Sequence, residues 1–237
     1  MHQRLAINRK LCIAPMMEYT DRHGRFFLRK ISHQALLYSE MITAKAVLHG
    51  SRETLLGFDV LEQPVALQLG GSNFEELSRA AAFGESVGYR EINFNVGCPS
   101  NRVQTGRFGA CLMAEPHLVA QCVKAMAHAV SIPITVKCRL GITGCEGFPK
   151  LAKFVELVSD SGAETFALHA RIAVLDGLTP KENREIPPLD YSSVYRIKEL
   201  FPDLEIILNG GVKTIDEIEQ HLGYVDGVMV GRAAFQD

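Results

Sequence analysis

The sequence lacks the cysteine spacing of a disulfide framework or of a zinc site. It has no C-x-x-C pair, and its cysteines are irregularly spaced, at Cys12, Cys98, Cys111, Cys122, Cys138 and Cys145. This pattern excludes the class of small secreted disulfide proteins, and we expect no metal. Most of these cysteines are expected to be small buried hydrophobic residues.

A targeting segment and a membrane span are also missing. No basic stretch followed by an apolar one opens the sequence, and no apolar run is long enough to cross a bilayer. We therefore expect a soluble, cytoplasmic protein with no membrane partner.

The sequence has no excess of either charge. Lysine and arginine together number 25 and aspartate and glutamate 27, which leaves a formal net charge of −2. If RNA is a partner, positive charge has to gather on one face of the protein. Candidates for that face, each of which is equally well a solvated surface charge, are Arg22, Arg25, Arg102, Arg107, Arg139, Arg171 and Lys181.

The sequence does contain an alternation of short apolar runs and amphipathic stretches. Its 237 residues, 47% of them hydrophobic, suffice for one α/β barrel or two small domains. The apolar runs predict strands over 11–14, 36–39, 65–69, 91–95, 134–138, 165–169, 205–209 and 227–230. The amphipathic stretches predict helices over 74–87, 116–130, 151–161, 192–200 and 215–221, with N-caps at Asn73 and Thr214.

Eight strands separated by helices predict a (β/α)8 barrel over residues 1–237, with an open doubly wound sheet as the alternative. Polar residues at or near five strand ends favour the barrel, because it would gather them at one mouth. They are Gln68, Asn95, Lys137, His169 and Asn209. The sequence stops at Asp237, directly after the last predicted strand. We therefore expect a barrel truncated there, without an eighth covering helix, as one part of a longer protein.

One cysteine stands apart from the others. Cys98 lies in a Gly-Cys-Pro-Ser turn that directly follows the strand predicted over 91–95. In that position its thiol projects into the space above the sheet. Cysteine thiols ordinarily have a pKa of about 8.5, so at neutral pH they can donate a proton as well as act as nucleophiles. The turn alone leaves both roles open.

Two glycine-rich turns follow the last two predicted strands. They are Asn209-Gly210-Gly211 and Gly231-Arg232. Glycine lets the backbone approach an anion, and barrels often bind phosphate after these strands. The arginine adds a guanidinium suited to phosphate. The turns therefore predict a phosphorylated cofactor or substrate, although tight turns without a ligand would look similar.

Several segments together resemble the tRNA-dihydrouridine synthases. They are APMMEYTDRHGRFFLRK (14–30), PVALQLGG (64–71), INFNVGCPSNRVQTGRFGACLM (92–113), VKCRLGI (136–142), KENREIPPLDY (181–191), LNGGV (208–212) and VMVGRA (228–233). The branch that the sequence resembles most is bacterial and acts on tRNA D-loop uridines 20 and 20a. The resemblance implies an FMN-dependent barrel that reduces the uracil C5–C6 double bond with electrons from NADPH.

The resemblance also implies roles for individual residues. Cys98 is implied as the general acid that protonates C5, a role worth typically 10²–10⁴-fold in rate. Asn95 and Arg184 are implied to read the uracil. The residues implied to hold FMN are Ala14, Pro15, Met16, Gln68, Lys137, His169, Asn209, Gly210, Gly211, Gly231 and Arg232.

Relatives of this family carry a helical domain after the barrel that helps to hold tRNA, and this sequence ends before it. We therefore expect this chain to hold FMN but to bind tRNA poorly. A monomer is favoured for the full-length protein.

Two other functions remain open. One is a related FMN-dependent enzyme that reduces or oxidises a free pyrimidine. The other is a truncated, non-catalytic flavin-binding fragment.

Overall fold

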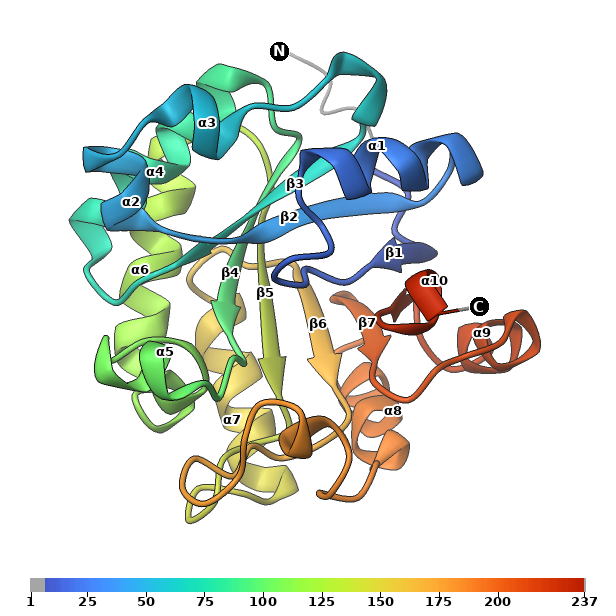
Figure 1. Cartoon of the computed structure of the whole chain (residues 1–237). Helices are drawn as coiled ribbons and strands as arrows, with labels where there is room; N and C mark the ends of the chain where they lie inside the picture. Colours follow the sequence, from blue (N-terminus) through green and yellow to red (C-terminus); the bar gives the residue numbers. More distant parts are fainter. Residues whose placement is uncertain (1–6, 237) are drawn as a thin grey trace.

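Eight parallel strands close into a barrel in which each strand pairs with the next and β8 pairs with β1 (Figure 1). The computed structural model describes residues 7–236. Closure confirms the (β/α)8 barrel over the open sheet. The strands are β1 Leu11–Ile13, β2 Leu36–Thr43, β3 Val65–Gly70, β4 Glu91–Val96, β5 Ile134–Arg139, β6 Thr165–His169, β7 Glu205–Asn209 and β8 Gly227–Val230.

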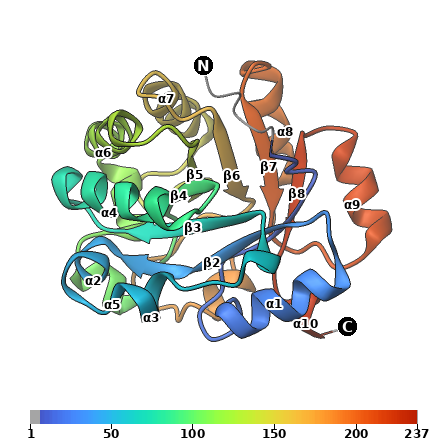
Figure 2. The same ribbon diagram turned by 90° about the horizontal axis from the view of Figure 1, so that it is seen from above.

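Helices surround the strands, as the view along the barrel shows (Figure 2). They are α1 Arg22–Ile31, α2 Ala44–His49, α3 Arg52–Leu56, α4 Phe74–Val87, α5 Asn101–Thr105, α6 Pro116–Ala129, α7 Phe148–Ser159, α8 Tyr191–Leu200, α9 Ile215–Leu222 and α10 Ala233–Gln236. Three 3-10 turns lie between them, η1 Val60–Glu62, η2 Gly109–Ala114 and η3 Glu182–Arg184. In the described part of the chain, no helix combines the length and the apolar character that crossing a bilayer requires.

Local capping sets where the main helices begin. Asn73 accepts a hydrogen bond from the Glu76 N–H at the start of α4, and Thr214 forms a reciprocal capping box with Glu217 at the start of α9. Both predicted N-caps are confirmed. Pro116 opens α6, where its missing N–H costs nothing.

The predicted strands all form, and 165–169, 205–209 and 227–230 have the predicted bounds. β2 runs four residues further than predicted, because after a register shift it pairs with β3 as far as Thr43. A helix of four residues, none of them buried, follows the last strand. In this helix, α10, Phe235 packs edge-on against Tyr19 with ring centroids 5.3 Å apart.

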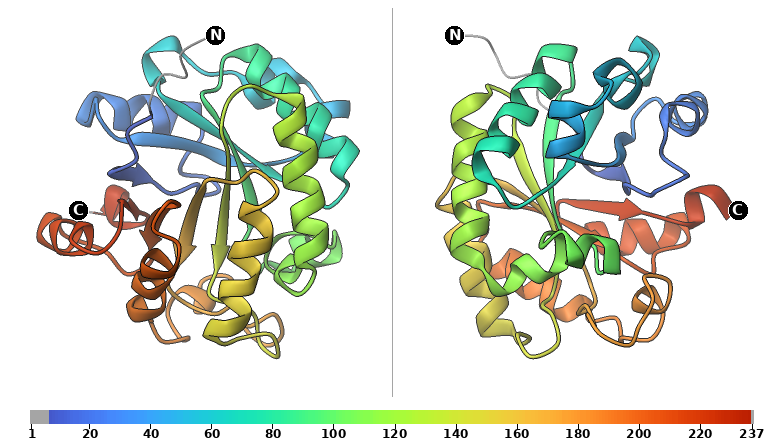
Figure 3. Two further views of the ribbon diagram at one scale, coloured as in Figure 1. Left: turned by 180° about the vertical axis from the view of Figure 1, so that it is seen from behind. Right: turned by 60° about the vertical axis from the view of Figure 1, so that its left-hand side comes forward.

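Two apolar layers hold the barrel together. The larger lies between the strands and the helices, and its β-strand members include the fully buried Leu67, Phe94 and Phe166. Helices α6 and α7 cover this layer side by side (Figure 3). The smaller layer fills the barrel interior with residues such as Tyr38 and Met229. On β4 and β5 the interior positions are polar instead, and so is Gln68 on β3 above the interior Ala66.

Candidate active site

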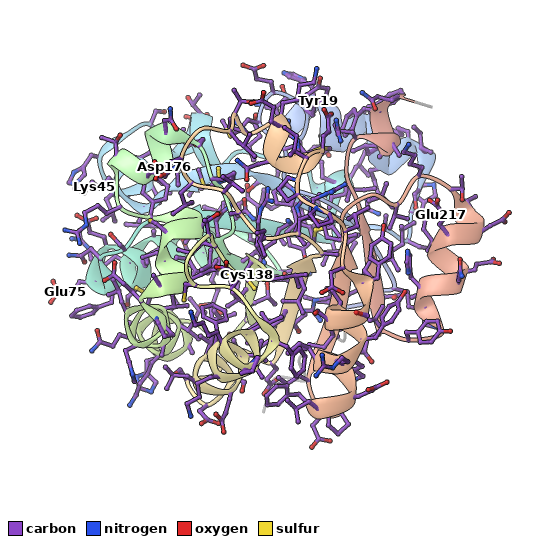
Figure 4. The ribbon with its side chains drawn as sticks, turned by 90° about the horizontal axis from the view of Figure 1, so that it is seen from below. Tyr19, Lys45, Glu75, Cys138, Asp176 and Glu217 are labelled. Atoms are coloured by element: carbon purple, nitrogen blue, oxygen red, sulfur yellow. The ribbon has the colours of Figure 1, made fainter. Side chains whose placement is uncertain are left out.

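The five polar residues predicted at strand ends meet at one end of the barrel. Strand pairing places Asn95 beside Lys137, and His169 beside Asn209. The Lys137 Nζ donates to Asn209 Oδ1 at 2.9 Å, and the Asn95 Nδ2 donates to Gln68 Oε1 at 2.9 Å. Figure 4 looks onto this end, with Cys138, the neighbour of Lys137 on β5, near the middle. We call this end the mouth.

Asn95 holds the loop that carries the candidate catalytic cysteine. Its Oδ1 accepts hydrogen bonds from the backbone N–H groups of Gly97 (3.2 Å) and Cys98 (3.0 Å). This is an Asx turn, in which the side chain imitates a backbone turn. The Cys98 carbonyl accepts from the Ala110 N–H, and the partly buried Sγ lies 3.5 Å from Ser100 Oγ. The cysteine is therefore fixed by its backbone while its thiol stays partly accessible.

Positive charge surrounds His169 in the mouth. Burial, followed by the charges of Arg139, Lys137, Arg171 and Arg184, holds the pKa of His169 well below its ordinary value. The imidazole is therefore neutral at neutral pH. Burial and the charge of Arg139 also lower the pKa of Lys137 to about 8.

Arg139 joins three loops of the mouth. This buried side chain donates to the carbonyl of Gly97 at 3.2 Å, of Ile172 at 3.1 Å and of Asn183 at 2.8 Å. It thereby connects the cysteine loop with the segment that carries Arg184. Burial lowers the pKa of Arg139 to about 10. The sequence offers Arg139 as a candidate for an RNA-binding face, and its burial makes that prediction wrong; its place two residues after Lys137, at the end of β5, is the signal for its role in the mouth.

The first glycine turn, Gly210-Gly211, is tightly packed against its neighbours. Gly210 and Gly211 have φ values of +107° and +79°, which favour glycine. A Cβ on Gly210 would lie 2.6 Å from the His169 ring, and one on Gly211 would lie 2.6 Å from the Tyr191 hydroxyl. That hydroxyl donates to the Gly210 carbonyl at 2.9 Å. The sequence predicts this turn but carries no signal for Tyr191, which supports it.

The second glycine turn borders the predicted flavin floor. A Cβ on Gly231 would lie 3.7 Å from Met16 Sδ and 4.0 Å from the Ala14 Cβ, so it would be in ordinary contact with both. Arg232 forms an exposed ion pair with Glu185 at 2.7 Å. Exposed pairs of this kind are weak, so the guanidinium can exchange its partner for a phosphate.

The mouth fits an anionic flavin nucleotide. Within the described residues, none of the four cations around His169 forms an ion pair, and the buried Arg171 Nε has no hydrogen-bond partner. Burial lowers the pKa of two of them, Lys137 and Arg139, and buried cations without a counter-charge are costly, so the cluster favours an anionic ligand. The glycine turns and the apolar Ala14 and Met16 beside it suit a phosphate and a ring system.

The seven basic residues proposed for an RNA-binding face differ in their exposure. Arg25 and Arg139 are buried, so they add nothing to the surface; Arg25 pairs with Glu62 at 2.6 Å. Arg22, Arg107 and Lys181 are exposed, and Arg171 is partly buried. The side chain of Arg102 lies outside the described part of the structure.

The remaining cysteines have structural surroundings. Cys12, Cys122 and Cys138 are buried, whereas Cys111 and Cys145 are partly buried. The Cys111 thiol donates to the Phe108 carbonyl at 3.1 Å. Among the described residues, no group of three or more histidine, cysteine or acidic side chains is arranged to hold a metal ion.

Comparison with known proteins identifies the family. Residues 12–237 match the family described as dihydrouridine synthase (Dus). A Synechocystis protein named tRNA-dihydrouridine(20/20a) synthase is 57% identical over 227 residues, which are 96% of this chain and 68% of that protein. Proteins of the same name from Pseudomonas syringae pv. tomato and Haemophilus ducreyi are 54% and 55% identical, over 99% and 100% of this chain and 70% and 72% of theirs. The chain therefore belongs to the dihydrouridine synthase family.

Proposed function

We propose that this protein is a tRNA-dihydrouridine synthase that reduces the C5–C6 double bond of D-loop uridines 20 and 20a. The observation that carries the proposal is the mouth itself, where a fixed thiol loop, a cation cluster without a counter-charge and two glycine turns meet. The names of the relatives, which match nearly the whole chain, support the tRNA substrate. Such a substrate implies a cytoplasmic reaction.

The cofactor in this proposal is FMN, with NADPH as the electron donor. When bound, the reduced flavin supplies the hydride that adds to uracil C6. The two glycine turns and Arg232 would hold its phosphate. Lys137 would place positive charge beside the ring system and would offset the negative charge that reduction brings. Ala14, Pro15 and Met16 line the same site.

Cys98 then completes the reduction by donating its thiol proton to C5, so that two hydrogens have been added across the double bond. Asn95 can only donate to the base, since both lone pairs of its Oδ1 are taken by backbone N–H groups. It therefore reads a uracil carbonyl. The exposed Arg184 can offer two N–H groups to a carbonyl, which a lysine could not match.

The uridine has to leave its stack in folded RNA before it reaches the mouth. Exposed cations at the mouth would contact phosphates, so binding should weaken as salt rises. Arg22, Arg107 and Lys181 support this face.

A gene deletion tests the function. Dihydrouridine is mapped in tRNA from cells that lack the full gene and from the same cells re-expressing wild type, Cys98→Ala or Cys111→Ala. We expect loss of dihydrouridine at 20 and 20a, recovery with wild type and C111A, and at least a hundredfold slower formation with C98A. Unchanged tRNA in the deletion strain would refute the function, and full recovery with C98A would refute the proton donor.

The free-pyrimidine alternative is separated by substrate. Purified protein reduced with NADPH is offered free uracil or an unmodified tRNA transcript, while flavin reoxidation is followed by absorbance. Turnover of tRNA alone supports the proposal. Turnover of free uracil alone favours the alternative.

A further inference from the structure

A continuous series of hydrogen-bonded, buried side chains links the mouth to the opposite end of the barrel; in this subsection we call this series the side-chain chain. It passes through Asn95, Gln68, Asn93 and Thr135, and it ends at Glu91. The links are Asn95 Nδ2 to Gln68 Oε1 (2.9 Å), Gln68 Nε2 to Asn93 Oδ1 (2.8 Å), Asn93 Nδ2 to Thr135 Oγ1 (2.8 Å) and Thr135 Oγ1 to Glu91 Oε1 (2.6 Å). All five side chains are buried.

Alternation along β4 explains the arrangement. Residues two apart on a strand point to the same face, so Glu91, Asn93 and Asn95 all face the barrel interior. Strand pairing sets Gln68 of β3 and Thr135 of β5 directly beside Asn93. The hydrogen bonds therefore run along β4, and side chains of the two neighbouring strands, β3 and β5, connect successive β4 residues.

Both ends of the chain dictate its direction. At the end far from the mouth, the Glu91 carboxylate can only accept hydrogen bonds. It accepts them from Arg9 Nε at 2.8 Å, Tyr38 Oη at 2.9 Å and Thr135 Oγ1. At the mouth, the backbone N–H of Cys98 can only donate a hydrogen bond. Every amide between them must therefore accept on the side of the mouth and donate toward the carboxylate.

Ion pairs of Arg9 hold Glu91, at the end far from the mouth, in place. Arg9 pairs with Glu91 and also with Glu205 at 2.8 Å. Burial opposes the charge of Arg9, but the two carboxylates raise its pKa above the ordinary value. A carboxylate bound to this cation cannot readily become a donor, so the Thr135 hydroxyl proton is committed to it.

We propose that Glu91 is a positioning residue for the mouth. Its carboxylate, acting through Thr135 and Asn93, fixes the orientation of the Gln68 and Asn95 amides. In this orientation Asn95 accepts a hydrogen bond from the Cys98 N–H. The second side-chain N–H of Asn95, like that of Gln68, is left to donate to a ligand in the mouth. The ligand-related consequence rests on the proposed function, whereas the direction of the chain does not.

Two threonines make a matched pair for the test. Thr135 and Thr165 lie opposite each other on β5 and β6, and each buried hydroxyl donates to a carboxylate that pairs with Arg9. Only Thr135 continues to the Gln68 amide. Thr135→Val removes the acceptor of Asn93 at nearly constant volume, and Thr165→Val removes the equivalent hydroxyl outside the chain.

The direct readout is nuclear magnetic resonance of the side-chain amides in the flavin-free 237-residue chain. We expect T135V to shift the Asn93, Gln68 and Asn95 amide signals and to speed their hydrogen exchange about tenfold. T165V should leave them at wild-type values, and Thr135→Ser, which keeps the hydroxyl, should restore them. Equal effects of T135V and T165V, or no effect of T135V, would overturn the proposal.

The second readout is the dissociation constant for FMN from fluorescence titration. We expect about a five- to tenfold weaker affinity in T135V, as for one lost hydrogen bond, and less than a twofold change in T165V. Should T135V not fold, Asn93→Ala cuts the same chain and is judged by the Gln68 and Asn95 signals. These signals need neither flavin nor tRNA, so they remain decisive if the protein forms no dihydrouridine.

Discussion

Lys137 makes flavin binding depend on pH in a range where most lysines do not titrate. Burial, and then the charge of Arg139, lower its pKa to about 8, and its Nζ donates to Asn209 in the mouth. With that pKa the side chain is about 90% charged at pH 7 and about 10% charged at pH 9. If only the charged form holds FMN, affinity should fall about tenfold between these two values.

The assay is a fluorescence titration of FMN at half-unit steps from pH 6.5 to pH 9.5 and constant ionic strength. Two variants serve as controls. Lys137→Arg stays charged throughout, and Lys137→Met stays neutral, so both should give flat profiles, the first with the tighter binding. A flat wild-type profile would refute the reasoning, and so would a decline of the same size in both variants.

The stability of the flavin-free chain should change in the opposite direction. The unfolded chain retains the ordinary lysine pKa of 10.5, so between pH 8 and that value it binds more protons than the folded chain. The contribution of Lys137 to stability therefore increases with pH in this window while flavin affinity decreases. Urea unfolding of wild type and K137M at pH 7.5 and pH 9.5 measures the difference, which K137M should lack.

Three further substitutions test the architecture of the mouth and its support. Gly211→Ala should weaken FMN binding at least tenfold and destabilise the chain by about 1–2 kcal/mol, because φ is +79° and the new Cβ would lie 2.6 Å from the α8 tyrosine hydroxyl. Gly177→Ala is the control, since its φ is +84° and the space around it is open. It should show the destabilisation from backbone strain alone, and the FMN affinity measured by titration should not change. Arg139→Met should lower the free energy of unfolding in urea by at least about 1.5 kcal/mol and speed iodoacetamide alkylation of Cys98, because three loop carbonyls lose a charged donor. An unchanged alkylation rate would argue against the role of Arg139 in joining the loops. Glu62→Gln should cost about 3–5 kcal/mol in urea unfolding because it leaves its buried α1 arginine without a counter-charge, and a loss below about 1 kcal/mol would contradict this.

Helix α1 shows where hydrophobic patterning fails. It buries Arg25 and Arg29 and exposes Phe27 and Ile31, which is the reverse of the pattern that predicts a helix. Both arginines bind η1, since Arg25 pairs with the Glu62 carboxylate while Arg29 donates two hydrogen bonds to the Glu62 carbonyl. Glu62 lies more than 30 residues from both arginines in the sequence, so the local sequence carries no signal for this contact.

The sequence by itself determined the barrel, the order of its strands, two helix caps and the gathering of polar strand ends, because apolar periodicity and capping are local properties. The cysteine loop and the glycine turns were likewise readable, since Gly and Pro restrict the backbone wherever they stand. Only the tertiary structure decided what the polar residues do to one another. It joined the Asn95 amide to Gln68 on the neighbouring strand, buried Arg139 between three loops and lowered the pKa of Lys137. These properties arise from closure of the barrel, which brings residues far apart in sequence within hydrogen-bond distance and away from water.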